Sequence, residues 1–268
     1  MKKIIALAMT VVMSGILLVG CGSTGKAGTA STGGATNSAP QKIVIGLDDT
    51  FAPMGFRDEK NELVGFDIDL AKEAAKRLNM DVEFKPIDWN SKEVELNSKK
   101  IDAIWNGLSI TEDRKKNLSF TKPYLANRQI VVVQPNSAIK TKADLAGKVV
   151  GTQEGSSSLD AINADAATAK SFKELKKYPD YVAALLDLKA GRVEAIVVDE
   201  VVGRYYVAKK PGEYAIIKDD FGAEEYGVGL RKDDTQLLEK LQKALDDMKK
   251  EGKSAEISKK WFGEDIVK

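Results

Sequence analysis

The chain has 268 residues, 43% of them hydrophobic and 30% charged, which are ordinary proportions for a globular protein. It contains no histidine and one cysteine, Cys21. Histidine-dependent nucleophiles, histidine metal sites, zinc clusters and intrachain disulfides are therefore excluded, and no metal or cofactor is expected. Because two of the 41 basic residues are Lys2 and Lys3, the chain beyond residue 20 carries 39 basic and 40 acidic residues, a balance that does not favour nucleic-acid binding.

The first twenty residues predict a lipoprotein signal peptide. Lys2 and Lys3 precede an apolar run over residues 4–19, which is too short for a stable membrane span. The run ends in Leu18-Val19-Gly20-Cys21, which resembles the bacterial lipobox, in which the cysteine thiol receives a diacylglyceryl group and becomes the first mature residue. Two acyl chains such as palmitate, at about 0.8 kcal/mol per buried methylene, hold a protein durably on a membrane. We therefore expect an extracytoplasmic protein, lipid-anchored through Cys21 to the bacterial cell membrane; the alternative is a chance Gly-Cys after an ordinary signal peptide.

Residues 21–41 predict the lipidated cysteine and a flexible linker. The segment 22–41 has no large apolar residue and cannot contribute to a core. A flexible coil of this length reaches about 25 Å, enough to hold a globular body clear of a membrane. A G-x-G-x-x-G pattern at residues 20–25 resembles a dinucleotide-binding fingerprint, but it has no strand before it and no helix after it. We reject that interpretation.

From residue 42 onwards, short apolar runs alternate with helical patterns, which favours parallel α/β sheets. The length suits two lobes better than one. The predicted strands are at residues 42–47, 82–84, 101–105, 129–134, 148–151, 171–176, 195–198 and 226–230. The predicted helices are at residues 66–78, 92–98, 156–167, 181–189, 201–208 and 236–249, with a last one ending near residue 261.

Candidate binding residues follow the predicted strands, because open α/β sheets bind ligands at the carboxyl ends of their strands. In the first half of the chain these are Asp48 with Phe51, and Trp89. Asp48 has an equally good explanation as a turn or helix-cap residue. A single Trp such as Trp89 is most often part of the core.

A third group lies in residues 106–114, after the predicted strand at 101–105. Thr111, Glu112 and Asp113 predict a helix start. Arg114 is unusual in a first turn, because the helix dipole disfavours a cation there, and it would be tolerated if a carboxylate came to meet it. The alternative is a surface ion pair with a neighbouring acid.

The second half of the chain contributes a fourth group. Ser156 and Ser157 open a helix after the strand at 148–151, so free backbone N–H groups and hydroxyls are available to a carboxylate. Asp199 follows the strand at 195–198. Its alternative role is to cap the next helix and nothing more.

Taken together, these positions resemble the bacterial extracellular solute-binding proteins of polar amino-acid ABC importers, the family of the glutamine- and lysine/arginine/ornithine-binding proteins. The match runs in order over about residues 42–265. The segments that carry it are Asp48-x-x-Phe51-x-Pro53-Met54-Gly55-Phe56, Leu63 to Leu70, Asp102 to Arg114, Phe120-Thr121-x-Pro123-Tyr124, Asp144-Leu145-x-Gly147-Lys148 and Lys259 to Gly263.

The resemblance implies a two-lobed, type II periplasmic-binding fold, in which two mixed α/β sheets flanked by helices are joined by two hinge strands. The hinge strands should lie near residues 124–128 and 222–226. The first lobe would comprise residues 42–125 plus 226–268, and the second residues 126–225. The lobes would close over a free amino acid held between them.

The resemblance also implies a role for each candidate residue. Arg114 would bind the α-carboxylate through a bidentate pair of hydrogen bonds. The backbone N–H groups of Ser109, Ser156 and Ser157 would bind the same carboxylate. Asp199 and the Gly107 carbonyl would take the α-ammonium. Phe51 and Trp89 would enclose the ligand side chain, and Asp48 would meet its polar or cationic end.

The resemblance therefore implies a monomeric binding protein that delivers a polar amino acid to an ABC permease and ATPase complex and has no enzymatic activity. Acids near the cleft, Asp48, Asp49 and Glu154, favour a basic amino acid over a neutral polar one. One alternative is a surface adhesin or amino-acid sensor on the same fold. The other is an enzyme similar to cyclohexadienyl dehydratases, for which an ammonium-binding Asp199 would be unnecessary.

Overall fold

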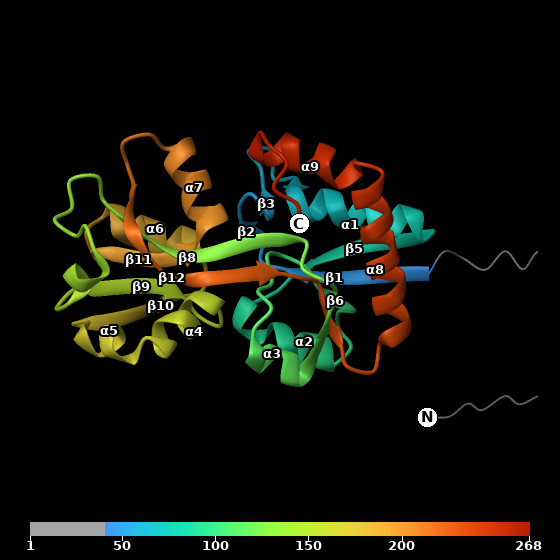
Figure 1. Cartoon of the computed structure of the whole chain (residues 1–268), viewed down its shortest axis with the longest axis horizontal. Helices are drawn as coiled ribbons and strands as arrows, with labels where there is room; N and C mark the ends of the chain where they lie inside the picture. The colour runs from blue at the N-terminus through green and yellow to red at the C-terminus, as the bar shows by residue number, and fades with distance from the viewer. Residues whose placement is uncertain (1–40) are drawn as a thin grey trace, which may run out of the picture. The chain divides into compact units, whose positions relative to one another are not determined.

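Two five-stranded sheets form the framework of residues 41–268, the part of the chain that the computed structural model describes (Figure 1). We call the parts built on them the first and second lobes. The predicted signal peptide, Cys21 and the linker up to residue 40 lie outside the described residues. The family fold implied by the sequence, with two mixed sheets flanked by helices, is confirmed.

The sheet of the first lobe has the strand order β5-β1-β6-β13-β7. β1 pairs in parallel with β5 and β6, whereas β13 is antiparallel to β6 and β7. The strands are β1 (Gln41–Leu47), β5 (Met80–Pro86), β6 (Ala103–Ile104), β7 (Leu118–Phe120) and β13 (Gly229–Arg231). Ile43, Ile45 and Leu47 of β1 point to one face of the sheet and are buried, and Val44 on the other face packs against the apolar cluster that contains Leu96.

Helices cover both faces of this sheet, with α1 and α9 on one side and α2 and α3 on the other (Figure 1). The helices of this lobe are α1 (Phe66–Arg77), α2 (Lys92–Asn97), α3 (Glu112–Asn117), α8 (Thr235–Lys250) and α9 (Lys253–Phe262). α1 shows the predicted amphipathic pattern, since Leu70, Ala71 and Ala74 are buried while Lys72 and Lys76 are exposed.

The sheet of the second lobe has the order β10-β9-β11-β8-β12. β9 is parallel to β10 and β11, and β8 is antiparallel to β11 and β12. Its strands are β8 (Leu125–Val133), β9 (Val149–Gln153), β10 (Glu174–Tyr178), β11 (Ala195–Asp199) and β12 (Ala215–Tyr226). Its helices are α4 (Ser157–Ala164), α5 (Ala166–Ser171), α6 (Tyr181–Lys189) and α7 (Glu200–Lys209).

Two paired strands, β8 and β12, connect the lobes (Figure 1). Their paired ends run from Ala223 opposite Arg128 to Tyr226 opposite Leu125. At that point Tyr226 also forms a bridge with Ser109 of the first lobe. β8 and β12 are the hinge strands of the fold, and the domain boundaries after residues 125 and 225 stay a prediction.

Several elements differ from the sequence-based expectation, among them β12, of which only the hinge end at residues 222–226 was expected. A three-stranded sheet of β2 (Thr50–Phe51), β3 (Gly55–Arg57) and β4 (Leu63–Val64) was not predicted, nor were the 3₁₀ helices η1 (Trp89–Ser91) and η2 (Lys142–Leu145). The predicted helix at 156–167 is two helices, because the Asp165 side chain caps a new start by accepting from the Thr168 N–H at 3.2 Å. The predicted strand at 171–176 begins only at Glu174, after α5 ends.

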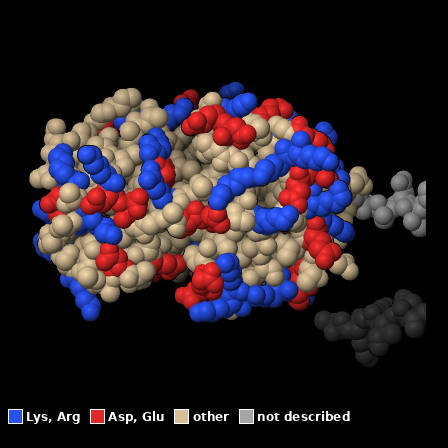
Figure 2. Space-filling model, viewed as in Figure 1, with Lys and Arg blue, Asp and Glu red and all other residues tan. Residues whose placement is uncertain are grey.

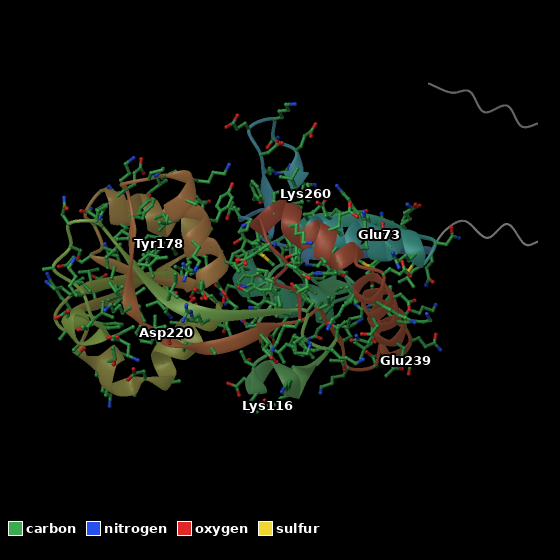
Figure 3. All side chains as sticks on the ribbon, turned by 45° about the horizontal axis from the view of Figure 1, so that its top comes forward. Glu73, Lys116, Tyr178, Asp220, Glu239 and Lys260 are labelled. Atoms are coloured by element: carbon green, nitrogen blue, oxygen red, sulfur yellow. The ribbon has the colours of Figure 1, made fainter. Side chains whose placement is uncertain are left out.

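The surface of this body mixes both signs of charge. Figure 2 shows Lys and Arg interspersed with Asp and Glu over the visible face. The outer helices carry much of this charge, and Figure 3 labels Glu239 of α8 and Lys260 of α9. Among residues 41–268, no helix combines the length and apolar character needed to cross a membrane.

Candidate functional site

Polar residues from both lobes meet where the two sheets face each other across the hinge. The Ser109 and Ser157 hydroxyls are 2.8 Å apart. The Gln153 side-chain amide donates to Asp48 at 2.7 Å. These contacts join segments that follow β1 and β6 in the first lobe to the last residue of β9 and the helix start after it in the second. The lobes are therefore closed on each other along the strand ends where the sequence placed the site.

Arg114 lies at this junction and is 5% exposed. The Thr111 side chain caps α3 by accepting from the Arg114 N–H, so the helix start is as predicted. One guanidinium nitrogen donates to the Ser109 carbonyl at 2.9 Å, and another donates across the cleft to the Gly155 carbonyl at 3.1 Å. Within the described residues it forms no ion pair with an acid, because Glu112 and Asp113 pair with lysines instead. The surface ion-pair alternative for Arg114 is wrong.

Asp199 is 3% exposed and its carboxylate does not cap α7. One carboxylate oxygen accepts from the Asn127 amide at 2.7 Å, the Gln129 amide at 2.9 Å and the Tyr226 hydroxyl at 2.7 Å. Burial, followed by the nearby Glu224 carboxylate, raises the pKa of Asp199 to about 7. The capping alternative is therefore wrong, and a buried acid lies on the second-lobe side of the junction.

Asp48 combines its two predicted roles. One carboxylate oxygen accepts from the Thr50 backbone N–H and hydroxyl, which is the turn interpretation. The other accepts from Gln153 of the second lobe, which places it in the cleft. Burial raises the pKa of Asp48 above its ordinary value, even though these hydrogen bonds oppose that shift.

The two predicted aromatic residues have different surroundings. The Phe51 ring faces Tyr181 of the second lobe, with 5.9 Å between ring centroids. Trp89 packs in a first-lobe apolar cluster with Leu96 and Ile101, so it is part of the hydrophobic core. The prediction that Phe51 and Trp89 together enclose a ligand side chain stays a prediction.

Gly107, Ser156 and Ser157 lie at the same junction. Gly107 has φ +57°, and a β-carbon there would lie 2.7 Å from the Phe51 ring, so glycine is required. The Ser156 hydroxyl caps α4 by accepting from the Leu159 N–H, and it donates to the Gln153 carbonyl at 2.7 Å. The Ser157 hydroxyl faces Ser109 instead. Ser157 therefore contacts the opposite lobe directly, whereas the Ser156 side chain orders the helix start.

The chain matches the family model of bacterial extracellular solute-binding proteins, family 3, over residues 43–264. It belongs to this family. The histidine-binding periplasmic protein of Salmonella typhimurium is 37% identical over 246 residues, which cover 88% of this chain and 94% of that protein. A Streptococcus pneumoniae ABC uptake transporter substrate-binding protein with bound histidine superposes with a TM-score of 0.82 at 38% identity, covering 84% of this chain and 94% of that one. An ancestral arginine-binding protein bound to arginine has a TM-score of 0.78 at 43% identity, covering 84% of this chain and 100% of that one.

Sequence reasoning missed several cleft residues of this solute-binding protein, namely Asn127, Gln129 and Glu224. Asn127 and Gln129 lie two apart on β8, so their side chains share a face, and Glu224 of β12 is the register partner of Asn127. Two amides at alternate positions before the apolar run 130–133 were the available signal. The register that brings Glu224 to them depends on a long-range strand pairing that the sequence does not display.

Lys92 was also missed. It is 4% exposed, and its ammonium donates to the Trp89 carbonyl at 3.2 Å and, across the cleft, to the Gly155 carbonyl at 2.8 Å. Burial and the nearby Arg114 guanidinium lower the pKa of Lys92 to about 7. In this solute-binding protein, Arg114 and Lys92 therefore both donate to the Gly155 carbonyl. The acids Asp199 and Glu224 both accept from the Asn127 and Gln129 amides.

A buried acid outside the cleft supports the Gly107 turn. Asp67 of α1 accepts from the Gly107 N–H at 2.7 Å and from the Tyr124 hydroxyl at 2.9 Å. Burial raises the pKa of Asp67 to about 7. Its other oxygen and the Trp105 indole nitrogen, both buried, have no hydrogen-bond partner.

Replacing Asp67 with Ala is expected to lower the free energy of unfolding by about 2 kcal/mol, because a buried N–H and a buried hydroxyl lose their acceptor. Replacing it with Asn keeps one acceptor oxygen and should cost less. Urea unfolding of both variants at pH 7 measures the difference. Equal stability of the Ala variant and the wild type would contradict the supporting role.

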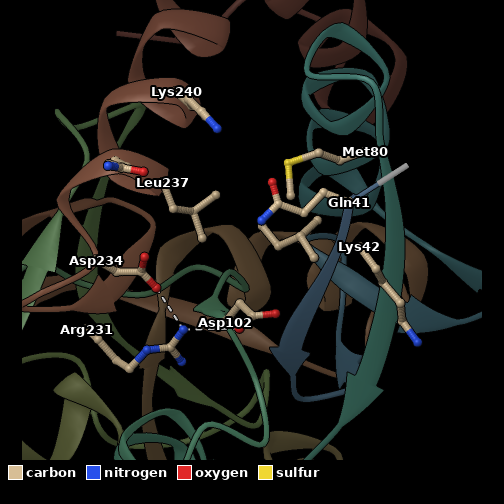
Figure 4. A pocket seen from close by; sticks show the side chains of 10 residues that line it. Gln41, Lys42, Met80, Asp102, Arg231, Asp234, Leu237 and Lys240 are labelled. Carbon is tan, nitrogen blue, oxygen red and sulfur yellow. Dashed lines mark hydrogen bonds and ion pairs between the residues drawn. The ribbon is translucent and has the colours of Figure 1, made fainter. Parts of the chain in front are cut away.

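A cavity of about 260 Å³ lies apart from this junction, between the start of β1 and α8 in the first lobe (Figure 4). Three of its charged lining residues are paired with one another, because Arg231 bonds to Asp102 at 3.1 Å and to Asp234 at 2.7 Å. The predicted binding residues are absent from its lining. Among residues 41–268, no cluster of three or more acidic, histidine or cysteine side chains is placed to hold a metal ion.

Proposed function

We propose that this chain is the substrate-binding component of an ABC importer and that it closes its two lobes over a free polar amino acid. The observation that carries the proposal is the placement of Arg114 from the first lobe and Asp199 from the second, both buried at the lobe junction. A free amino acid carries an anionic and a cationic group a few bonds apart. A buried cation and a buried anion on opposite lobes match those two groups, and each is costly without a partner.

The residues predicted to bind the two charged groups of the ligand backbone have a place in this proposal. Arg114 has five N–H groups, and the two hydrogen bonds to carbonyls leave others for a ligand carboxylate. Asp199 and the Gly107 carbonyl take the α-ammonium. Charge-assisted hydrogen bonds contribute about 1.5–3 kcal/mol each, so four to six of them offset the desolvation of a zwitterion. Ligand contacts to both lobes stabilise the closed arrangement.

The ligand we propose is a polar amino acid, with a basic one favoured. Relatives bind histidine, arginine and cystine by name, and an ancestral arginine-binding protein was solved with glutamine bound. Asp48 supports a basic side chain because it lies in the cleft on the first-lobe side. Its bond to Gln153 also provides an amide for a neutral polar side chain.

We further propose that the protein is exported and lipidated on Cys21, and that it acts as a monomer for a membrane permease and ATPase. The lipobox sequence supports the anchor. The relatives are named as binding proteins, two of them of ABC transporters, which supports a binding role without enzymatic activity.

A thermal-shift panel of the twenty amino acids and L-cystine tests the binding function on a lipid-free form beginning after Cys21. An amino acid at a hundred times its dissociation constant should add about 2.7 kcal/mol to the stability. We expect stabilisation by one or a few polar amino acids, with arginine, lysine or histidine among them. No response to any of the twenty-one compounds would overturn the proposed function.

A further inference from the structure

A second acid lies beside Asp199 in the cleft. Glu224 is on hinge strand β12, opposite Asn127 of β8. One of its carboxylate oxygens accepts from the Ser109 hydroxyl, the Asn127 amide and the Gln129 amide, each at 2.6 Å. The Ser157 hydroxyl lies 3.2 Å from the same oxygen. Residues from both lobes and from the hinge therefore converge on this one carboxylate.

Asp199 and Glu224 use the same two amide donors. The Asn127 side-chain nitrogen bonds to Asp199 at 2.7 Å and to Glu224 at 2.6 Å. The Gln129 nitrogen bonds to the same two carboxylates, at 2.9 and 2.6 Å. Two acids that share both donors are close neighbours, and like charges at such separation repel strongly in a buried site.

Within the described residues, no basic side chain balances this pair. Arg128, on the same hinge strand as the two amides, bonds to Glu200 at 2.7 Å and lies 3.5 Å from Asp220. Arg114 donates to two carbonyls. The neighbouring Glu225 is already paired with Lys268. A small cation between Asp199 and Glu224 would therefore stabilise the two carboxylates.

We propose that Glu224 and Asp199 together form a two-carboxylate receptor for the ligand α-ammonium. The proposal rests on the proposed function and adds a binding residue to it. An ammonium has three N–H donors, enough to bond to both carboxylates and to one neutral acceptor. Ligand binding then places a positive charge between the two acids, which attracts both of them and offsets their mutual repulsion. The site consequently selects for a free amine, beyond what a single acid provides.

The test is the variant Glu224→Gln, which keeps the length of the side chain and an acceptor oxygen for the three donors but removes the charge. The probe is whichever of arginine, histidine, glutamine or cystine binds the wild type best. The comparison ligand is the corresponding 2-hydroxy acid, in which a hydroxyl replaces the α-ammonium. The matched control is Glu225→Gln, which removes the charge of the next residue along β12, a residue that pairs with Lys268. Isothermal titration calorimetry measures both compounds on all three proteins at pH 8.

We expect Glu224→Gln to weaken binding of the amino acid by about tenfold or more. Binding of the hydroxy acid should change by less than about twofold, since that ligand has no ammonium to lose an interaction. Glu225→Gln should bind both as the wild type does. If the hydroxy acid binds too weakly to measure, the amino-acid result decides alone.

Three results would overturn the proposal. An unchanged affinity for the amino acid would remove Glu224 from the site. An increased affinity would show that the carboxylate competes with the ligand. Equal losses for the amino acid and the hydroxy acid would show a general structural defect. Each of these leaves the proposed function standing as long as the wild type binds an amino acid, whereas a wild type that binds none refutes both.

Discussion

Replacing Arg114 with Ala is expected to weaken the binding of every amino acid at least about a hundredfold. The ligand α-carboxylate would be desolvated in a closed cleft without its guanidinium partner. The loss should not depend on the ligand side chain, because all amino acids share the carboxylate. The thermal-shift panel and calorimetry with the best ligand measure it.

Two further variants make the Arg114 result specific. Arg114→Lys keeps the charge but not the planar fork, so it should recover only part of the affinity. Arg192 of the second lobe pairs with Asp187 and its side chain is 59% exposed, so Arg192→Ala should bind normally. Normal binding by Arg114→Ala would refute the site assignment.

The parts of the site that the sequence predicted are those with local signals. Asp48, Arg114 and Asp199 each follow a strand of recognisable apolar residues, and Thr111 marks the start of α3. Neighbouring residues alone determine such positions, because a strand end and a helix start are properties of short segments. The order of these segments then carried the family resemblance and, through it, the two-lobed fold.

The parts that were missed depend on long-range geometry. Glu224 reaches Asn127 only through the register of β12 against β8, which shifts twice along the pairing. These irregularities also explain why β12 was not predicted from residue 215, since acids at 219 and 220 interrupt its apolar alternation. Lys92 looks like an ordinary surface residue of an amphipathic helix. Its environment depends in part on the second lobe, whose Gly155 carbonyl accepts a hydrogen bond from the Lys92 ammonium.

These missed residues change the physical description of the cleft. For the two charged groups of the ligand backbone, the sequence predicted one cation and one anion, Arg114 and Asp199. The structure adds Lys92 on the side of Arg114 and Glu224 on the side of Asp199. Two basic side chains therefore contact Gly155 in the cleft, and two acidic side chains share the Asn127 and Gln129 amides. Such a layout orients a zwitterion and disfavours ligands that carry only one of its charges.

Replacing Asp199 with Asn is expected to weaken amino-acid binding by about a hundredfold while making the ligand-free protein more stable at pH 8. Binding falls because the α-ammonium loses an ionic partner. Stability rises because the Asn oxygen still accepts from Asn127, Gln129 and Tyr226 but no longer repels Glu224. Calorimetry measures the first effect and urea unfolding the second.

The pH dependence of this stability gain follows from the pKa of Asp199. Burial and Glu224 raise that pKa to about 7, well above the ordinary value near 4, so the folded protein holds the proton more tightly than the unfolded chain does. The contribution of Asp199 to stability is present below about pH 4 and is lost as the pH rises through about 7. The Asn variant has no such loss, so its advantage should grow by about 1–3 kcal/mol between pH 5 and pH 8.

Asp187→Asn is the matched control, because Arg192 and Tyr178 hold the pKa of Asp187 below its ordinary value. That variant should lose stability at pH 8, the opposite sign, and bind amino acids normally. A destabilised Asp199→Asn at pH 8 would show that the ionised carboxylate supports the fold through its three hydrogen bonds. Retained affinity in the same variant would place the ammonium elsewhere in the cleft. If Asp199 binds the ligand and destabilises the fold, Asp199→Asn should gain stability and lose affinity together.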